Sequence, residues 1–378
     1  MSAAPAHRNG HAFLAALVAH RFPNRPVVVV TDTLKSQEAL HADLTTWLNV
    51  AARTEFGEKA AARHRVPLFF PSWEVLPHDS KLPHSDIISE RLEALLSLSV
   101  DGGAAEGTPS LPVVTTITAV RQRTFSPDEL RRRTRRLGRG DRVNPLDLIE
   151  WLEDQGHEPE AKVTSKGELS WRGGIVDVWP LSSPWPVRLE FFGDELESLR
   201  EFDPATQISR ETIDFVRIPP AGELSLLKAA TRGDGTASGP TGSAPSLCTL
   251  FDHLPENALV ILADPDALLD EELRQAQQIP PGDPFHADWQ ETLEVASRGG
   301  RTVISLPASE EPEAVIGSLD AYRPIGATLP EAAVAEAQRR EFFHQMHRWI
   351  RQGSAVHVFC NNEGERQRFT EIWKESAL

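Results

Sequence analysis

The sequence predicts an α/β protein: an open, mostly parallel sheet layer with a small antiparallel α+β domain inserted into it. Over the first 120 residues, short β-branched runs alternate with segments of helical spacing, which is typical of a parallel sheet covered by helices. Residues 121–218 instead hold strand patterns separated by turn signals. Runs of the first kind return at 258–262 and 302–306, so we expect the middle domain to be an insertion.

The first layer begins at Val27 to Val30, four valines in a row, which predict a buried parallel strand. Apolar residues at helical spacing predict a helix over 36–48. The further elements are expected in this order: a strand at 66–70, a helix capped by Ser85 or Asp86, a Gly-rich loop at 101–110 and a strand at 112–120.

The middle region predicts one helix followed by three strands. Asn144 and Pro145 are typical of a helix start, and Gly156 is typical of its end. The strands are expected at 175–179, 187–192 and 197–202, with a turn at Gly193–Asp194 between the last two.

The last third predicts a mobile Gly/Ser loop at 229–246, then the two returning strands, then a strand at 355–359 and a helix at 363–373. One strand and one helix cannot bury a core alone. We therefore expect residues from about 340 to begin a further domain that is cut off at Leu378; the alternative is that they dock on the preceding layer. The expected domains are 1–120, 121–218, 219–339 and 340–378.

Composition excludes several classes of protein. The 378 residues include 55 acidic and 39 basic ones, and the net charge of −16 argues against a surface that coats nucleic acid throughout. Cys248 and Cys360 are too few for a disulfide scaffold or a multi-cysteine zinc site. No apolar run reaches 18 residues and no secretion signal is recognisable, so a cytoplasmic protein is expected.

The sequence predicts no enzyme within residues 1–378. Lys35 and Ser36 follow the first strand, but Val29 and Leu34 stand where a phosphate-binding loop needs glycine. The acidic stretch 269–272 is typical of a solvated helix face. His78 and His84 lie six residues apart, which is not a known metal-ligand spacing. We therefore expect no catalytic residue, cofactor or metal here, and no ATP binding or hydrolysis.

An arginine-rich segment runs from Arg121 to Arg142. It holds nine arginines against three acidic residues, which leaves a local charge of +6. Two interpretations stay open: contacts with DNA phosphates, or a solvated face on an acidic molecule. The densest part, and the candidate phosphate contacts, are Arg131, Arg132, Arg133, Arg135 and Arg136.

Several longer motifs are specific enough to indicate a family. They occupy residues 71–79, 86–92, 167–180, 187–200 and 202–207. In order and spacing they resemble the UvrB-like amino-terminal module of the bacterial transcription-repair coupling factor family, Mfd. The resemblance is strongest from about 67 to 220.

The resemblance implies a UvrB-like domain 1A, an inserted domain 2 and a domain 1B. It implies that domain 2 binds UvrA, the damage sensor of nucleotide excision repair. The contact residues of the family correspond here to Arg172, Arg188 and Phe192. It also implies an RNA-polymerase-binding domain and a double-stranded-DNA translocase motor using ATP and Mg, whose place would be after Leu378.

Strand alternation agrees with this assignment. Along 187–192, Arg188, Glu190 and Phe192 share one face, and the odd positions share the other. If the odd face is core, Phe192 is an exposed aromatic beside an arginine, a combination enriched at interface hot spots. The alternatives are that Phe192 packs under a neighbouring domain and that Arg172 forms only a surface ion pair.

Three alternative functions make different demands on the sequence. UvrB itself needs a phosphate loop and an aromatic hairpin, whereas 76–89 is short and Tyr322 is the only tyrosine. A stand-alone UvrB-like adaptor without a motor would fit the same motifs. A degenerate nucleotide-binding hydrolase would use the first α/β layer and would have to bind ATP.

Overall fold

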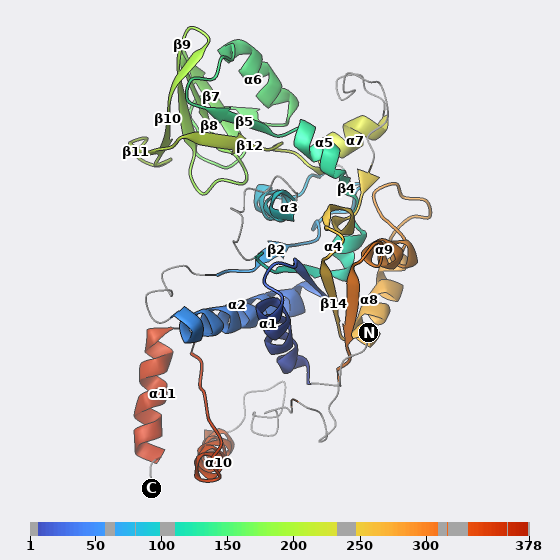
Figure 1. The fold of residues 1–378 in the computed structure, drawn as a ribbon, viewed down its shortest axis with the longest axis vertical. Coiled ribbons are helices and arrows are strands. Elements are labelled where there is room, and N and C mark those ends of the chain that lie inside the picture. The colour runs from blue at the N-terminus through green and yellow to red at the C-terminus, as the bar shows by residue number, and fades with distance from the viewer. Residues whose placement is uncertain are drawn as a thin grey trace. The chain divides into compact units, whose positions relative to one another are not determined.

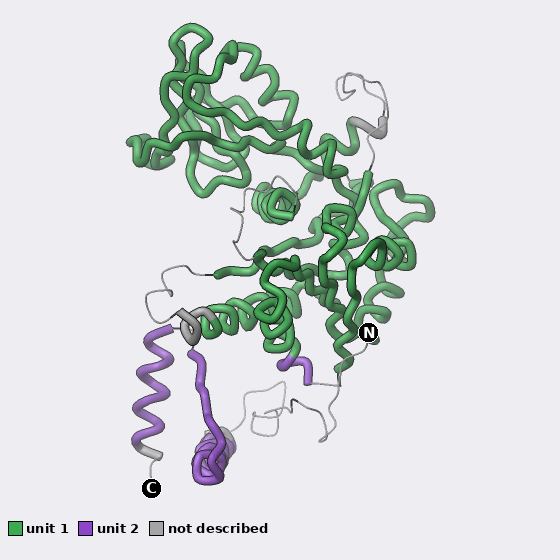
Figure 2. The backbone as a smooth tube through the Cα atoms, viewed as in Figure 1, with its two compact units in different colours: residues 1–4, 11–308 green, residues 5–10, 309–378 purple. Residues whose placement is uncertain are grey.

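The computed structural model describes residues 7–56, 65–79, 81–98, 110–232, 247–308, 316, 332–360 and 362–376. The chain divides into two units, each described by itself (Figure 1 and Figure 2). Unit 1 comprises residues 1–4 and 11–308, and unit 2 comprises residues 5–10 and 309–378. Within the described ranges, no helix is both long and apolar enough to cross a bilayer.

Unit 1 is built on a five-stranded sheet in which every neighbouring pair is parallel. The central strand β1 pairs with β3 on one side and with β14 on the other, with Val27 opposite Leu259. Strands from before and after residues 121–218 therefore lie side by side, which confirms the predicted insertion. In spatial order the strands are β15 (Thr302–Leu306), β14 (Leu259–Ala263), β1 (Val27–Thr31), β3 (Val113–Thr116) and β2 (Leu68–Phe70).

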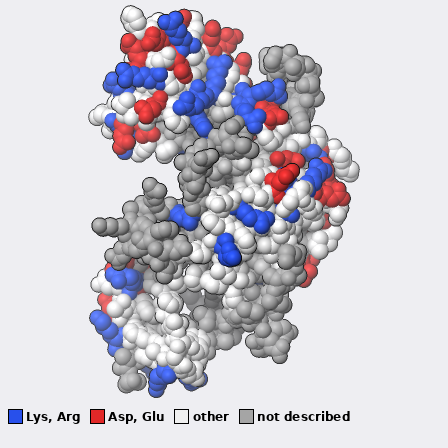
Figure 3. Space-filling view, viewed as in Figure 1, with Lys and Arg blue, Asp and Glu red and all other residues white. Residues whose placement is uncertain are grey.

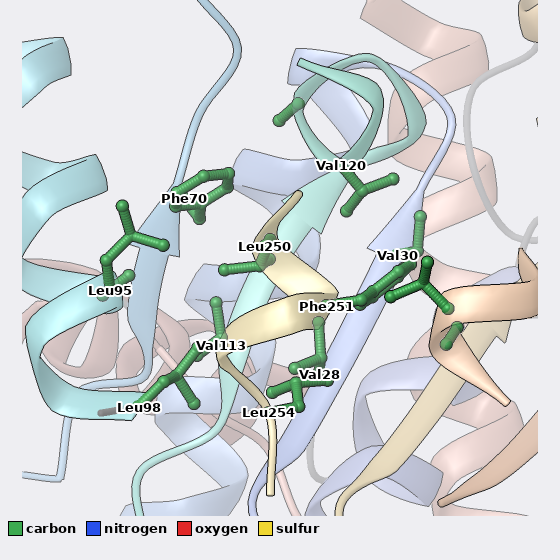
Figure 4. Close-up of a cluster of buried hydrophobic side chains, with 14 of the residues drawn as sticks. Val28, Val30, Phe70, Leu95, Leu98, Val113, Val120, Leu250, Phe251 and Leu254 are labelled. Atoms are coloured by element: carbon green, nitrogen blue, oxygen red, sulfur yellow. The ribbon is translucent and has the colours of Figure 1, made fainter. Parts of the chain in front are cut away.

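Both faces of this sheet are covered, which explains why β1 is apolar throughout. Val27 and Val29 pack in a core with Leu44 of α2, and α1 packs on α2. Val28 and Val30 face the other core, which includes Leu95 of α3 and Phe251 (Figure 4). The helices around the sheet are α1 (His11–Arg21), α2 (Leu34–Phe56), α3 (Ser85–Leu98), α4 (Ile117–Arg121), α8 (Pro265–Ala276) and α9 (Trp289–Ala296), with a 3₁₀ turn at Leu250–His253.

The inserted domain is a six-stranded sheet with one helix packed on it. All neighbouring strands are antiparallel except β6 and β7. Helix α6 (Pro145–Asp154) starts as predicted: the Asn144 side chain accepts a hydrogen bond from the Leu146 amide at 2.9 Å. In spatial order the strands are β11 (Ser209–Thr212), β10 (Glu195–Phe202), β9 (Val187–Phe192), β8 (Ile175–Val178), β7 (Glu168–Arg172) and β6 (Glu158–Pro159).

Short ribbons and helices connect this domain to the parallel sheet. Strand β5 (Arg135–Gly138) pairs with β12 (Phe215–Ile218), and β4 (Thr124–Phe125) pairs with β13 (Leu247–Cys248). Helix α5 (Pro127–Arg132) precedes β5, and α7 (Leu224–Arg232) follows β12.

A buried ion pair holds this connection. Arg91 on α3 contacts Glu223, just before α7, at 2.7 and 3.0 Å, and neither side chain is exposed. Glu223 also accepts hydrogen bonds from Trp73 at 2.9 Å and Thr124 at 2.7 Å. A buried pair of charges is tolerated when its hydrogen-bonding capacity is met in this way. Trp73 and Arg91, which belong to the family-like motifs, thus join the parallel sheet to the returning chain.

Unit 2 contains the helices α10 (Ala332–Arg351) and α11 (Glu363–Ser376), and a 3₁₀ turn at Arg8–Gly10. Aromatic rings join the two helices: Trp373 stacks on His347 with 4.2 Å between centroids and lies 5.8 Å from Phe343.

Two predictions about elements were wrong, and a third gave a helix that is too short. The expected strand 112–120 ends at Thr116, because the Thr116 hydroxyl accepts a hydrogen bond from the Ala119 amide at 3.1 Å and starts helix α4. Residues 355–359 are irregular rather than a strand. The helix expected over 36–48 is confirmed, and it extends further at both ends, over Leu34–Phe56.

Two predicted loops fall largely outside the described residues. The loops were predicted at 101–110 and 229–246, and residues 101–109 and 233–246 lie outside the described ranges. Residues 229–232 belong to the end of helix α7 and not to a loop. The boundaries of the four expected domains stay a prediction.

Candidate protein-interaction face

The six-stranded sheet of the inserted domain has one covered and one open face. Leu148 and Leu152 of α6 lie in one core with Val176 and Leu189, so the alternate residues of β8 and β9 face the other way. We call this second side the outer face. It carries Arg172, Ile175, Asp177, Arg188, Glu190, Phe192 and Arg200.

Cross-strand register places the three predicted residues on this one face. Arg172 on β7 is opposite Ile175 on β8, which is opposite Glu190 on β9. Arg188 and Phe192 precede and follow Glu190 by two residues on the same strand. Since neighbouring strands lie about 4.8 Å apart, Arg172 is about 10 Å across the sheet from the strand that carries the other two.

Phe192 stands at the open end of the outer face. It ends β9 next to the Gly193 turn and is 77% exposed, whereas Phe202 at the other end is fully buried. The described residues leave most of this side chain uncovered, and the alternative that Phe192 packs under a neighbouring domain stays open. An aromatic ring left this exposed has apolar surface to bury against a partner.

Arg188 is held in a fixed orientation. Its Nε and Nη2 each donate to a different carboxylate oxygen of Asp177 at 2.8 Å, and its guanidinium lies over the Phe202 ring, 4.8 Å from the centroid. The Asp177 hydrogen bonds raise the pKa of Arg188, so the charge is permanent. A two-point pair of this kind fixes direction as well as energy.

Arg172 is the last residue of β7 and lies immediately before the Gly173–Gly174 turn. Gly173 has φ +61°, and a side chain on Gly174 would lie 2.7 Å from the Phe191 carbonyl oxygen, so both glycines are needed here. The Arg172 guanidinium donates to the Ala161 carbonyl at 2.5 Å.

Glu190 is engaged away from Arg172. It accepts a hydrogen bond from Ser198 at 2.5 Å and pairs with Arg200 at 3.5 Å. The alternative of a surface ion pair between Arg172 and Glu190 or Glu195 is not what the structure shows for Glu190, whose contacts are with Ser198 and Arg200, while Arg172 donates to the Ala161 carbonyl.

Sequence reasoning missed Asp177 and Arg200. Period-two alternation over 175–178 would have placed Asp177 on the outer face. Its pairing with Arg188 follows only from the register across β8 and β9.

The arginine cluster, Arg131, Arg132, Arg133, Arg135 and Arg136, is engaged within the domain. Arg131 pairs with Asp128 at 2.8 Å, and both Arg132 and Arg133 pair with Glu129. The other two lie over aromatic rings: Arg135 over Trp151 at 4.3 Å and Arg136 over Phe215 at 4.2 Å. Figure 3 shows basic and acidic side chains interspersed over the inserted domain. DNA contact by the cluster stays a prediction.

The segments weighed for nucleotide and metal chemistry have local roles. Ser36 lies in the first turn of α2, where its hydroxyl donates to the Asp32 carboxylate and to the Thr33 carbonyl. Residues 269–272 lie on α8. Across the residues that the structure describes, no three His, Cys, Asp or Glu side chains converge as metal ligands.

Comparison with known proteins defines the inserted domain first. Residues 136–224 match the family of the UvrB interaction domain. These bounds enclose all seven outer-face residues.

Comparison with individual proteins gives a more specific result than the family of the inserted domain. The chain is 31% identical over 220 residues to the transcription-repair-coupling factor of Haemophilus influenzae, which covers 58% of this chain and 18% of the relative. It is 30% identical over 219 residues to that of Escherichia coli, covering 58% and 17%. The factor of Mycobacterium bovis is 28% identical over 277 residues, covering 64% and 21%. The chain thus spans about a fifth of the length of these relatives, and the matches confirm the resemblance that the motifs predict.

Proposed function

We propose that this chain recruits UvrA in transcription-coupled nucleotide excision repair, through the outer face of the inserted domain. It acts by binding, and the chemistry of repair belongs to its partners. Arg172, Arg188 and Phe192 are the contact residues. ATP- and Mg-dependent translocation, and contacts with RNA polymerase and double-stranded DNA, are activities of the whole relatives and are not assigned to these residues.

One observation carries the proposal. Within the residues that match the UvrB interaction domain, Phe192 is 77% exposed at the end of the strand that carries an oriented arginine. Arginine and aromatic residues are the types most enriched among interface hot spots. The Asp177 pair lowers the entropy lost when Arg188 meets a carboxylate, because the guanidinium is already oriented.

Titration of the purified chain with purified UvrA tests the proposal. We expect saturable binding that Arg188→Ala weakens by about 2 kcal/mol or more, roughly thirtyfold. Arg188→Lys should lose nearly as much, because an ammonium group cannot reproduce the planar fork. The matched control is Arg136→Ala, which removes an arginine that also covers a phenylalanine ring, but on the β5–β12 ribbon.

Two results would contradict the proposal in different ways. Absence of UvrA binding by the wild-type chain overturns the function. Binding that is unchanged by both Arg188→Ala and Phe192→Ala overturns the site. Melting curves of each variant separate lost contact from lost fold.

A further inference from the structure

Ile175 lies in the middle of the residues assigned to UvrA contact. It is opposite Arg172 on one neighbouring strand and opposite Glu190 on the other. Asp177, which holds Arg188, follows it by two residues on the same strand and the same face. A partner that touches Arg172 on β7 and Arg188 and Phe192 on β9 must therefore pass over β8, and Ile175 is the side chain that β8 presents there.

The groups around Ile175 are polar and already paired. Arg188 is bonded to Asp177, Glu190 to Arg200 and Ser198, and Arg172 to the Ala161 carbonyl. Ile175 is nevertheless 38% exposed, although its neighbours Val176 and Val178 on the same strand are buried. Ile175 is thus an apolar side chain among paired polar groups at the centre of the outer face, and Phe192 adds apolar surface at the open end of that face.

These features are typical of a binding hot spot. Hot-spot residues lie near the centre of an interface and are desolvated there, while surrounding polar contacts keep water out. Resting on the proposed function, we propose that Ile175 is a central contact residue for UvrA. Together with Phe192 it fills an apolar depression on the partner that is rimmed by charged groups complementary to the outer face.

The assignment also sets the chemistry expected of the partner surface. The central part must be apolar, because Ile175 and Phe192 offer no hydrogen bond. Acidic groups must lie at the rim, within reach of the Arg188 and Arg172 guanidiniums. A partner that bound through charge alone would leave Ile175 without a role.

The test is a UvrA titration of three variants at position 175. Ile175→Ala should weaken binding about tenfold, which is in the range of central apolar truncations. Ile175→Asp should weaken it at least about a hundredfold, because it places an unpaired carboxylate beside Glu190 in a desolvated contact. Ile175→Thr keeps the β-branched shape that strands favour and replaces the ethyl branch by a hydroxyl, so it tests the apolar contact without disturbing β8.

The matched control is Ile208→Ala. Ile208 is 67% exposed and precedes β11, the edge strand next to the buried Phe202. It should change UvrA binding less than twofold, although more of its side chain is exposed.

The outcomes distinguish this inference from the proposed function. Binding lost in Ile175→Ala and Ile175→Thr with unchanged melting supports the central contact. Binding of Ile175→Thr within twofold of wild type, while Phe192→Ala still weakens it, overturns the role of Ile175 and leaves the proposed function standing. A wild-type chain that does not bind UvrA overturns both.

Discussion

The outer face and the arginine cluster are both rich in arginine, but their arginines have different surroundings. In the cluster, Arg131 and Arg132 pair with acidic residues three positions away on the same helix. On the outer face, Arg188 pairs with Asp177 on the neighbouring strand, and the same face also carries an exposed isoleucine and an exposed phenylalanine. The cluster is denser in charge, whereas the outer face combines an oriented charge with apolar surface.

The exposed aromatic residues of the outer face and of the arginine cluster differ in how far an arginine covers them. Phe215 beside the cluster is 45% exposed, because the Arg136 guanidinium covers its ring. Phe192 is 77% exposed at the tip of its strand. Density of basic residues is therefore a weaker sign of an interface than one fixed arginine on the same face as uncovered apolar surface.

Charge reversal is the strongest way to break this comparison. Arg188→Glu should weaken UvrA binding by at least about 4 kcal/mol, roughly a thousandfold, because a new carboxylate faces both Asp177 and the partner's acidic rim. Arg132→Glu in the cluster should change it less than twofold. Equal losses measured by calorimetric titration would show that the partner responds to overall charge and not to the outer face.

Acid should weaken the inserted domain before it affects the contact residues. Burial lowers the pKa of His157 to about 4, and its Nε2 lies 3.3 Å from the Pro219 carbonyl oxygen. Because the folded-state pKa lies below the ordinary 6.5, the stabilisation is complete above pH 6.5 and is lost as pH falls towards 4. The loss is on the order of 3 kcal/mol. Melting curves recorded from pH 7 to 4 should show this loss of stability. The melting temperature of His157→Gln should depend less on pH. If it depends on pH as strongly as that of the wild type, another group causes the effect.

The ion pair between Asp177 and Arg188 can be tested by changing Asp177 alone. Asp177→Ala should weaken UvrA binding about tenfold, because Arg188 loses its fixed orientation. In an Arg188→Ala background the same change should have almost no effect on affinity, since Asp177 acts only through Arg188. A double-mutant cycle measures this coupling. An Asp177→Ala loss that persists in that background would indicate a structural role or a contact of its own.

The smallest expected effect concerns DNA. Each phosphate contact changes the slope of log affinity against log salt by about 0.9. Because Arg131 and Arg132 are already paired with acidic residues, we expect their joint replacement by alanine to change this slope by less than about 0.9, the value for one phosphate contact. A larger change, measured by fluorescence anisotropy from 50 mM salt upwards, would favour the phosphate-contact interpretation of the cluster.

The sequence predicted those parts of the fold that local pattern determines. The four valines of β1 can only be a strand buried on both faces, and the return of similar runs at β14 and β15 revealed the insertion. The strand expected at 112–120 failed because one threonine hydroxyl, Thr116, caps a helix there. The strand expected at 355–359 failed because a strand needs a neighbouring strand, and the sheets formed by the described residues do not include this segment.

The candidate site was predictable to the same extent. Alternation along β9 places Arg188 and Phe192 on one face, and the exposed fraction of Phe192 agrees with it. The roles of Asp177 and Ile175 depend on the register between β8 and its neighbours, of which the Gly173–Gly174 turn sets only the pairing with β7. Register is a property of paired strands, so a single strand's pattern cannot supply it.

The central claim is tested most directly by comparing two phenylalanine truncations in the same UvrA titration. Phe192→Ala should weaken binding at least about thirtyfold, and Phe215→Ala less than twofold, with little change in melting temperature for Phe192→Ala. Wild-type affinity in Phe192→Ala, or equal losses in both variants, would contradict the account, because uncovered apolar surface beside Arg188 would then have no special part in binding.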